Sequence, residues 1–354
     1  MVSQAPIVRD WTIKRYEPGD EVAILGLFNQ VFGLHRSLEH WRWQFAQNPY
    51  GGPFASQARR TADGALVGTH IVMPFLLNVR GRPVLAAQTL DLVVHPDYRK
   101  QGIFESSARD CFESMAPFGV KAVVAFPNAS SYPGFVRTLK WMRLVVPARY
   151  TLRLDVEQDV RLKLKVVWLA KAINRAFRAF RGMSLPRETT TGLHYESSAT
   201  LPDAYERLWQ AHATHEILSV WKDSKYFRWR YDANPDHSFT YHWLARGGDV
   251  VAFTVTTEMA GGLTLCEWIV ENRSVPLARQ LLSEVCRNAF QRRLRSVSFL
   301  GHDSGFFASA FAGFRGREAS ENVFVGRALD DPELNELMAH AEHWTTTFGD
   351  ADYV

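Results

Sequence analysis

A carboxylate, two cations and a glycine lie close together in segment 91–104, which reads DLVVHPDYRKQGIF. A β-branched apolar run ends at Pro96 and helical periodicity begins after Gly102, so the spacing predicts a strand, a turn and a helix. The first N–H groups of a helix have no intrahelical partners, and the helix dipole attracts negative charge there. Gly102 lets a phosphate approach the backbone, while Arg99 and Lys100 add positive charge. The turn is therefore a candidate anion site; the alternative is an ordinary strand-to-helix connection.

The pattern Val-x-Pro-x-x-Arg-x-x-Gly, which begins at Val94, resembles the acyl-CoA pyrophosphate motif of the GNAT superfamily of N-acyltransferases. That motif usually reads Gln/Arg-x-x-Gly-x-Gly/Ala, and Phe104 replaces its last small residue here. The resemblance implies that the turn holds the diphosphate of acyl-CoA, the donor substrate, through Arg99, Lys100, Gln101, Gly102, Ile103 and Phe104. It also implies that the backbone of Leu92 and Val94 lies along the pantetheine arm, and that Asn128 lies at the mouth of an opening between the fourth and fifth strands.

The order of the expected elements agrees with this resemblance. Strands are expected at residues 7–16, 54–60, 66–79, 84–94 and 120–126, and helices after Asp20, over 37–47, after Gly102 and from Pro127. The three strands between residues 54 and 94 are expected to be antiparallel. This order is similar to that of the GNAT fold, which implies an α/β fold (α+β, with a mixed sheet) over roughly residues 7–155.

Acyl transfer to an amine needs a base for the ammonium proton, donors for the tetrahedral oxyanion and an acid for the leaving thiolate. The resemblance makes Asp91 the candidate base and the Val94 N–H the candidate oxyanion donor. The alternative for Asp91 is a strand-end acid paired with a neighbour. The position of the family's acid tyrosine falls near Phe135 or Val136, so Tyr132, about one helical turn earlier, is the candidate acid; the alternative is a structural tyrosine.

The second half of the chain repeats part of the first. The motif WRWQFAQNP at 41–49 recurs as FRWRYDANP at 227–235, and both copies precede a pair of expected strands. In the continued alignment Glu267 matches Asp91, but no Arg-x-x-Gly motif follows it. The repeat predicts two tandem GNAT-like domains, of which only the first holds CoA. The second copy completes the sheet, walls the substrate cleft or binds the acceptor, and the sequence does not choose among these roles.

The predicted domain boundaries are 1–155 for the acyl-CoA-binding domain, 156–190 for a basic amphipathic linker helix, 191–330 for the second domain and 331–354 for a C-terminal helix and tail. Segment 160–182 holds seven Lys or Arg and no acid. On a helix its apolar side chains share one face and its basic side chains spread over the other, which is typical of peripheral contact with an anionic membrane surface. The alternative is packing between the domains. Nucleic acid is not an expected partner, because the aromatic side chains are not interleaved with the charges.

The overall composition is that of an ordinary globular protein, and a net charge of +4 does not by itself indicate nucleic acid. Cys111, Cys266 and Cys286 predict neither a disulfide framework nor a zinc site. No apolar run is long enough to span a bilayer and the N-terminus lacks the features of a signal peptide. We therefore expect a cytoplasmic protein, peripheral at the inner face of the membrane.

Two histidine patterns resemble parts of metal sites, His212-x-x-His215-Glu216 and His340-x-x-His343. Neither has a third ligand at a recognisable spacing, so no metal is expected. His70 and His95 are expected to be structural or solvated.

The sequence thus indicates an acyl-CoA-dependent N-acyltransferase that moves an acetyl or longer acyl group to a primary amine. The basic linker favours an amphiphilic acceptor at a membrane surface, such as a long-chain base or a lipid-linked amino sugar. Two alternatives stay open. One is a non-catalytic acyl-CoA-binding or scaffold protein, and the other is a Fem-type aminoacyl transferase, which uses charged tRNA.

Overall fold

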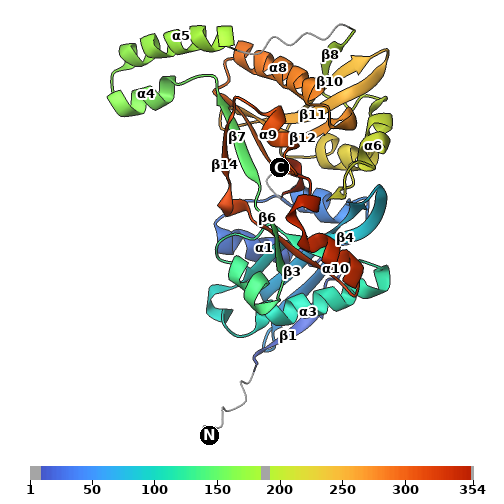
Figure 1. Ribbon diagram of the computed structural model, residues 1–354. Helices are drawn as coiled ribbons and strands as arrows, with labels where there is room; N and C mark the ends of the chain where they lie inside the picture. The colour runs from blue at the N-terminus through green and yellow to red at the C-terminus, as the bar shows by residue number, and fades with distance from the viewer. Residues whose placement is uncertain (1–8, 185–191, 352–354) are drawn as a thin grey trace. The chain divides into compact units, whose positions relative to one another are not determined.

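The computed structural model describes residues 9–184 and 192–351, whose strands form two sheets (Figure 1). The chain divides into two compact units. Unit 1 consists of the residues up to Leu77, Val84–Arg143 and Phe324–Ala339; unit 2 consists of Asn78–Pro83, Leu144–Val323 and the residues from His340 onward. This division differs from the predicted boundaries at 155, 190 and 330, because the chain leaves unit 1 at Arg143 and returns to it at Phe324.

Unit 1 follows the expected order of elements. Its helices are α1 (Glu21–Phe32), α2 (Leu38–Trp41), α3 (Ile103–Met115) and α10 (Pro332–Ala339). The strands of its sheet lie in the order β1 (Trp11–Arg15), β2 (Phe54–Arg60), β3 (Leu66–Val79), β4 (Arg82–Val94), β5 (Ala122–Ala125), β15 (Phe324–Ala328) and β6 (Met142–Val145). Strand β15, from the C-terminal part of the chain, therefore lies inside this sheet between β5 and β6.

Two expected helices of unit 1 differ from the structure, and the expected first strand is described only in part. The first strand was expected from Ile7, which lies outside the described residues. The helix expected from Pro127 is instead a turn followed by a five-residue π-helix, Gly134–Thr138. Segment 37–47 also divides, into α2 and a second π-helix, Arg42–Ala46.

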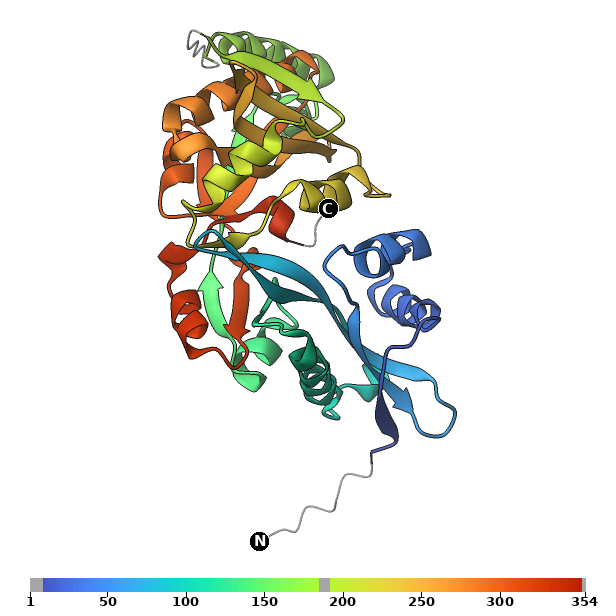
Figure 2. The same cartoon turned by 90° about the vertical axis from the view of Figure 1, so that its right-hand side faces the viewer.

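Helices α1 and α3 cover opposite faces of the sheet of unit 1 (Figure 2). Neighbouring residues of β3 alternate between the faces, so Leu66 packs with α1 while Val67 packs with Ile103 of α3. A Cβ at Gly68 would lie 2.6 Å from the Ile103 side chain. Glycine at this position therefore lets the first turn of α3 reach the sheet, which fixes the place of the turn before α3.

Strands β4 and β5 are parallel and separate part-way along their length. Their pairing runs from Ala86 with Ala122 to Gln88 with Val124, and within the described residues β4 continues to Val94 without further pairs to β5. The separation leaves one backbone edge of each strand available to a ligand. The opening lies at the carboxyl ends of two neighbouring parallel strands, where open α/β sheets bind their ligands.

Unit 2 has the same kind of architecture. Its helices are α4 (Glu157–Leu164), α5 (Val167–Ser184), α6 (Tyr205–Ala213), α7 (Ser224–Phe227), α8 (Val275–Gln291) and α9 (Phe306–Ala310), and the short strand β9 (Leu218–Val220) precedes α7. The strands of its sheet lie in the order β14 (Arg315–Glu318), β7 (Ala148–Arg153), β13 (Ser296–His302), β12 (Gly262–Val270), β11 (Asp249–Met259), β10 (Phe239–Arg246) and β8 (His194–Ser198). Strand β16 (Thr346–Thr347) pairs with the end of β13.

The internal repeat is present in the backbone of the two units. Residues Arg42–Ala46 and Arg228–Asp232 each form a π-helix, and each π-helix follows a short helix with a capped N-terminus. The Ser37 side chain accepts from His40 N in the first copy, and the Asp223 side chain accepts from Tyr226 N in the second. Because π-helices are rare, their recurrence at matching positions supports a common fold for the two units.

The single linker helix expected over 160–182 is in fact two helices. Lys165 adopts a left-handed conformation with φ 55°, which ends α4, and α5 begins at Val167. The two helices form a hairpin that extends from the sheet of unit 2 (Figure 1). Arg178, expected among the exposed cations, instead donates to Phe290 O, whereas Phe180 is exposed. Among the described helices, none combines the length and the apolar character that crossing a membrane requires.

Candidate active site

The turn before α3 presents backbone N–H groups at an uncapped helix N-terminus. Lys100 and Gly102 both have left-handed backbone, with φ 64° and 83°, and Gly102 is the N-cap residue without a side-chain cap. Gln101, between them, lacks such backbone, and an alternation of the two conformations turns N–H groups toward a common point, where an anion can bind. Arg99 is exposed and its Nε lies 3.4 Å from Val94 O, which holds its side chain beside the end of β4.

Arg9 adds a third cation, which the sequence did not indicate. Its Nη2 lies 3.9 Å from where a Gly102 side chain would begin, and its guanidinium lies over the Trp11 ring. The residue is far from the turn in the sequence, so only the fold of β1 beside α3 brings it there.

Phe104, which departs from the usual motif, packs away from the turn. Its ring meets the Phe135 ring edge-on, with 5.7 Å between the centroids, and lies against the backbone of Gly134. A Cβ at Gly134 would lie 2.7 Å from the Phe104 ring. The glycine therefore accommodates the bulk of Phe104, whose N–H stays in the first turn of α3.

Asp91 lies on β4 just past the last residue paired with β5. Its backbone has φ 20° and its side chain is buried. Arg36, from the loop between α1 and α2, donates through Nη1 to both carboxylate oxygens at 2.7 Å. The Arg36 guanidinium also lies over the Phe28 ring, 4.1 Å from its centroid. The alternative expected from the sequence, an acid paired with a neighbour, is thus realised, and the partner comes from a loop that no local pattern marks.

Leu92 and Val94 are half-buried on the same strand, beyond the point where β5 departs. Asn128 follows the end of β5 and organises the turn there, because its Oδ1 accepts from Ser130 N and Ser131 N at 2.9 and 3.0 Å. Tyr132 is half-buried, and within the described residues its hydroxyl makes no hydrogen bond. Asp91, Val94, Asn128 and Tyr132 therefore all belong to the carboxyl ends of β4 and β5.

The two isolated histidines do not join this group. His70 lies inside the core, 3.4 Å from Thr89 Oγ1, and burial lowers its pKa to about 3. His95 is half-buried in the turn, where its Nδ1 accepts from Asp97 N. His70 is structural, as expected.

Residues 12–143 match the family model of an acetyltransferase (GNAT) domain. This match lies almost entirely within unit 1. The match includes every site residue named from the sequence, from Asp91 to Tyr132. No curated protein matches the chain.

Solved structures share the tandem architecture over nearly the whole chain. A protein of unknown function from Enterococcus faecalis, described as a probable N-acyltransferase, has a TM-score of 0.64 at 12% identity, covering 91% of this chain and 73% of that chain. A GCN5-related N-acetyltransferase from Kribbella flavida has a TM-score of 0.62 at 17% identity, covering 91% and 71%. N-myristoyltransferase of Saccharomyces cerevisiae with bound myristoyl-CoA has a TM-score of 0.55 at 12% identity, covering 92% and 84%. The fold is that of two tandem GNAT-like domains, and the family match supports acyl-CoA-dependent N-acyltransferase activity in general.

The matching opening in unit 2 is filled by the chain itself. Strands β12 and β13 pair only from Leu263 to Leu265, and β16 pairs with β13 beyond that point. Glu267, the counterpart of Asp91, is fully buried and accepts from Lys222 Nζ at 2.5 Å and from Tyr231 OH at 2.6 Å. Segment 346–350 therefore lies where a GNAT domain opens its sheet.

Lys222 connects this C-terminal segment to the sheet of unit 2. Its Nζ lies 2.8 Å from Asp350 Oδ1 and donates to Thr347 Oγ1 at 2.6 Å. Burial alone lowers the pKa of this ammonium, but the charges of Asp350 and Glu267 outweigh burial and raise it. A buried charge needs such partners, so the cluster depends on all of its members.

The histidine patterns have different surroundings from each other. The Glu216 carboxylate contacts His212, Arg273 and Thr345. Burial raises the pKa of Glu216, but His212 and Arg273 outweigh burial and lower this pKa to about 2.

His340 and His343 lie with Glu342 so that their ligand atoms are within 4.8 Å of one another. The sequence pattern does not mark Glu342 as a third ligand, because Glu342 lies between the two histidines and outside the spacing of known metal motifs.

Exchanging Gly134 for alanine is expected to destabilise the protein by about 1–3 kcal/mol, because the new Cβ meets the Phe104 ring. The F104A substitution removes the clash, so the double variant G134A/F104A should be less destabilised than the sum of the single changes. Urea unfolding of the four proteins measures this coupling.

The matched control is G26A, because nothing lies within 4 Å of a Cβ on Gly26. It should show no coupling to F104A. Strict additivity of G134A and F104A would contradict the packing described for the start of α3.

Proposed function

We propose that this chain transfers an acyl group from acyl-CoA to a primary amine, and that unit 1 carries the reaction. One observation carries the proposal: the uncapped N-terminus of α3, with left-handed backbone at Lys100 and Gly102, adjoins the opening between β4 and β5. The helix N-terminus suits a diphosphate, and the opening between the strands suits an extended chain that carries amides. Acyl-CoA combines both groups.

The donor-binding residues follow from this arrangement. The N–H groups of Gln101, Gly102, Ile103 and Phe104 would hold the diphosphate, with Arg99 and Lys100 as added charge. The free edge of β4 at Leu92 and Val94 would pair with the amides of the pantetheine arm, as a peptide pairs with a sheet edge. Asn128 would border the same arm from the end of β5.

Asp91 and Tyr132 would carry the proton transfers. The amine nitrogen attacks the thioester carbonyl carbon, the Val94 N–H stabilises the oxyanion, and Asp91 takes the ammonium proton. The C–S bond then breaks, and Tyr132 donates its proton to the thiolate sulfur. The free hydroxyl of Tyr132 is available for this step, and Arg36 orients the Asp91 carboxylate.

The acceptor we propose is an amphiphilic amine at an anionic membrane surface. Most of the large hydrophobic side chains that are exposed in the described residues lie on the α4–α5 hairpin: Leu162, Leu164, Val166, Val167, Trp168, Ile173, Phe180 and Met183. Trp168 is 72% exposed and Met183 is 75% exposed. Cations such as Lys163, Lys171 and Arg175 lie among them in solvent. Exposed apolar groups beside basic ones are typical of helices that insert at a lipid interface.

A non-catalytic acyl-CoA-binding protein is the second candidate. The ion pair between Arg36 and Asp91 favours it, because an acid already bound by a guanidinium can serve to anchor a loop rather than to accept protons. The two candidates share the donor site and differ only in turnover.

The donor site is tested by G102V and its matched control G119V. Both glycines have left-handed backbone, φ 83° and 76°, so the two variants carry similar strain. Only G102V places a side chain at the anion site, and it should weaken CoA binding by about 10-fold or more in calorimetry. Equal CoA affinity of the two variants would contradict the proposed donor site. So would a parent protein that gives no heat when CoA is added.

The base is tested by D91N and R36A. With an amine panel and acyl-CoA, D91N should lower kcat by about 10²–10⁴-fold while CoA affinity stays near that of the parent. D91N should also abolish the acidic limb of the pH profile of kcat/KM. R36A should keep this limb and only shift its position along the pH axis. The alternative outcome is that D91N and R36A reduce activity and thermal stability in parallel and give the same pH profile as each other. Asp91 would then anchor the loop that carries Arg36 and would not act as a base.

The membrane contact is tested with the triple variant K163E/K171E/R175E, whose three side chains are exposed. Flotation with vesicles that contain anionic lipid should be strong for the parent and nearly lost in the variant, since each basic charge contributes about 1 kcal/mol near such a surface. The control K225E/R228E alters exposed cations elsewhere in unit 2 and should float like the parent. Flotation that is absent in the parent, or unchanged in the triple variant, argues against a membrane role.

A further inference from the structure

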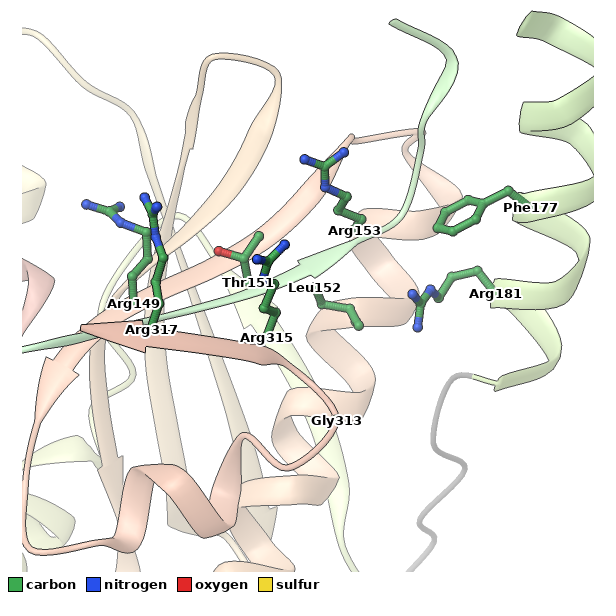
Figure 3. A pocket seen from close by; sticks show the side chains of 9 residues that line it. All are labelled: Arg149, Thr151, Leu152, Arg153, Phe177, Arg181, Gly313, Arg315 and Arg317. Carbon is green, nitrogen blue, oxygen red and sulfur yellow. The ribbon is translucent and has the colours of Figure 1, made fainter. Parts of the chain in front are cut away.

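A pocket on unit 2 gathers five arginines away from the candidate active site. Strand β14 pairs antiparallel with β7, so that Arg317 lies opposite Arg149 and Arg315 lies opposite Thr151. Because side chains alternate along a strand, Arg153 shares this face of the ribbon with them. Figure 3 shows the guanidinium groups of the four strand arginines projecting from the same side of the ribbon.

The fold does not require this concentration of charge. The other face of the ribbon supplies the core contacts, since Tyr150 stacks on Phe311 with 5.3 Å between the ring centroids. Like charges directly opposite each other across two strands are destabilising, and Arg149 and Arg317 are such a pair. The opposition of Arg149 and Arg317 therefore costs free energy, which an anion between the two guanidinium groups would offset.

The acids near the pocket do not neutralise it. Arg153 is paired with Asp159 of α4, and Arg149 lies 3.9 Å from Glu321 and 3.4 Å from Asn322 Oδ1. Arg315 and Arg317 are exposed, and within the described residues their guanidinium groups have no hydrogen-bond or ion-pair partner. Two guanidinium groups therefore remain available on the edge strand, where each offers a planar pair of donors to a phosphate.

Helix α5 forms the second wall of the pocket. Phe177 and Arg181 face the ribbon from this helix, with the Arg181 guanidinium 5.4 Å from the Phe177 ring centroid (Figure 3). Gly313 and Leu152 complete the lining, and the pocket has a volume of about 510 Å³. That volume is in the range of small-molecule sites, and the wall combines apolar contact with charge.

We propose that this pocket binds an anion whose phosphate groups carry two or more negative charges, with Arg315 and Arg317 as its main ligands. The site is separate from the acyl-CoA turn and does not depend on the acyltransferase proposal. A phosphate of this kind occurs as a soluble compound and also as a lipid headgroup. The lipid source is consistent with the exposed apolar residues of the adjoining hairpin, and the experiment separates the two.

The probe for the soluble source is inorganic pyrophosphate, titrated into the full chain by calorimetry with CoA present to occupy the turn before α3. The probe for the lipid source is flotation with phosphatidylcholine vesicles with and without phosphatidic acid. R315A/R317A should weaken binding by about 10-fold for each arginine removed. The control R207A/R228A removes two other exposed arginines from unit 2 and should bind like the parent.

The folding of R315A/R317A is checked independently by thermal unfolding in phosphate-free buffer. Because R317A removes the like-charge opposition to Arg149, its melting temperature should equal or exceed that of the parent. A melting temperature lowered by several degrees would contradict the electrostatic strain assigned to the ribbon.

Pyrophosphate binding that R315A/R317A abolishes supports a soluble ligand. Phosphatidic acid-dependent flotation that the same variant abolishes supports a headgroup. The proposal is overturned if neither probe responds to R315A/R317A, or if the control variant loses binding equally. Binding of transfer RNA through the same arginines, with no displacement by pyrophosphate, also overturns it in favour of a nucleic-acid surface.

Discussion

The separation of β4 from β5 after Gln88 is the constraint on which the candidate site depends. A parallel pair that continued to Val94 would satisfy its own backbone groups and leave no edge for a ligand. Asp91, with a φ of 20°, lies three residues beyond Gln88, in the part of β4 that no longer pairs with β5. The turn before α3 adds the second half of the site. Its position depends on Gly68, which brings Ile103 onto the sheet.

The two units share one architecture but differ at the separation between their central parallel strands, which is open in unit 1 and filled in unit 2. Unit 1 separates its strands beside Asp91, whereas unit 2 fills the matching space with segment 346–350. Glu267 keeps the position of Asp91 but is bound by Lys222 and Tyr231, so its carboxylate is committed to internal contacts. A buried cluster of this kind stabilises only when complete. Unit 2 thus fills the place that we propose as the reaction site in unit 1.

The sequence predicted the features that local patterns encode. Strands β2 and β3 match their expected ranges, because turn residues bound each run, and the Arg99–Gly102 spacing predicted the turn before α3. Arg36, Arg9 and the contact of Phe104 with Gly134 were not predicted, because each depends on residues distant in the chain. The break at Lys165 was also missed, since periodicity continues across it and only the left-handed backbone ends α4. The repeat could be read from the sequence, whereas the filling of its second opening depends on a tail with no pattern of its own.

The position of β15 bears on how the polypeptide acquires its shape during synthesis. Residues Phe324–Ala328 lie between β5 and β6, which were translated nearly two hundred residues earlier. A nascent chain emerging from the ribosome therefore cannot close its first sheet until most of the second half has been made. In the interval both inner strands expose unpaired edges, which are prone to wrong pairing. Completion of the amino-terminal sheet is thus a late event in synthesis, and a gene fragment that encodes only the first half lacks an interior strand of that sheet.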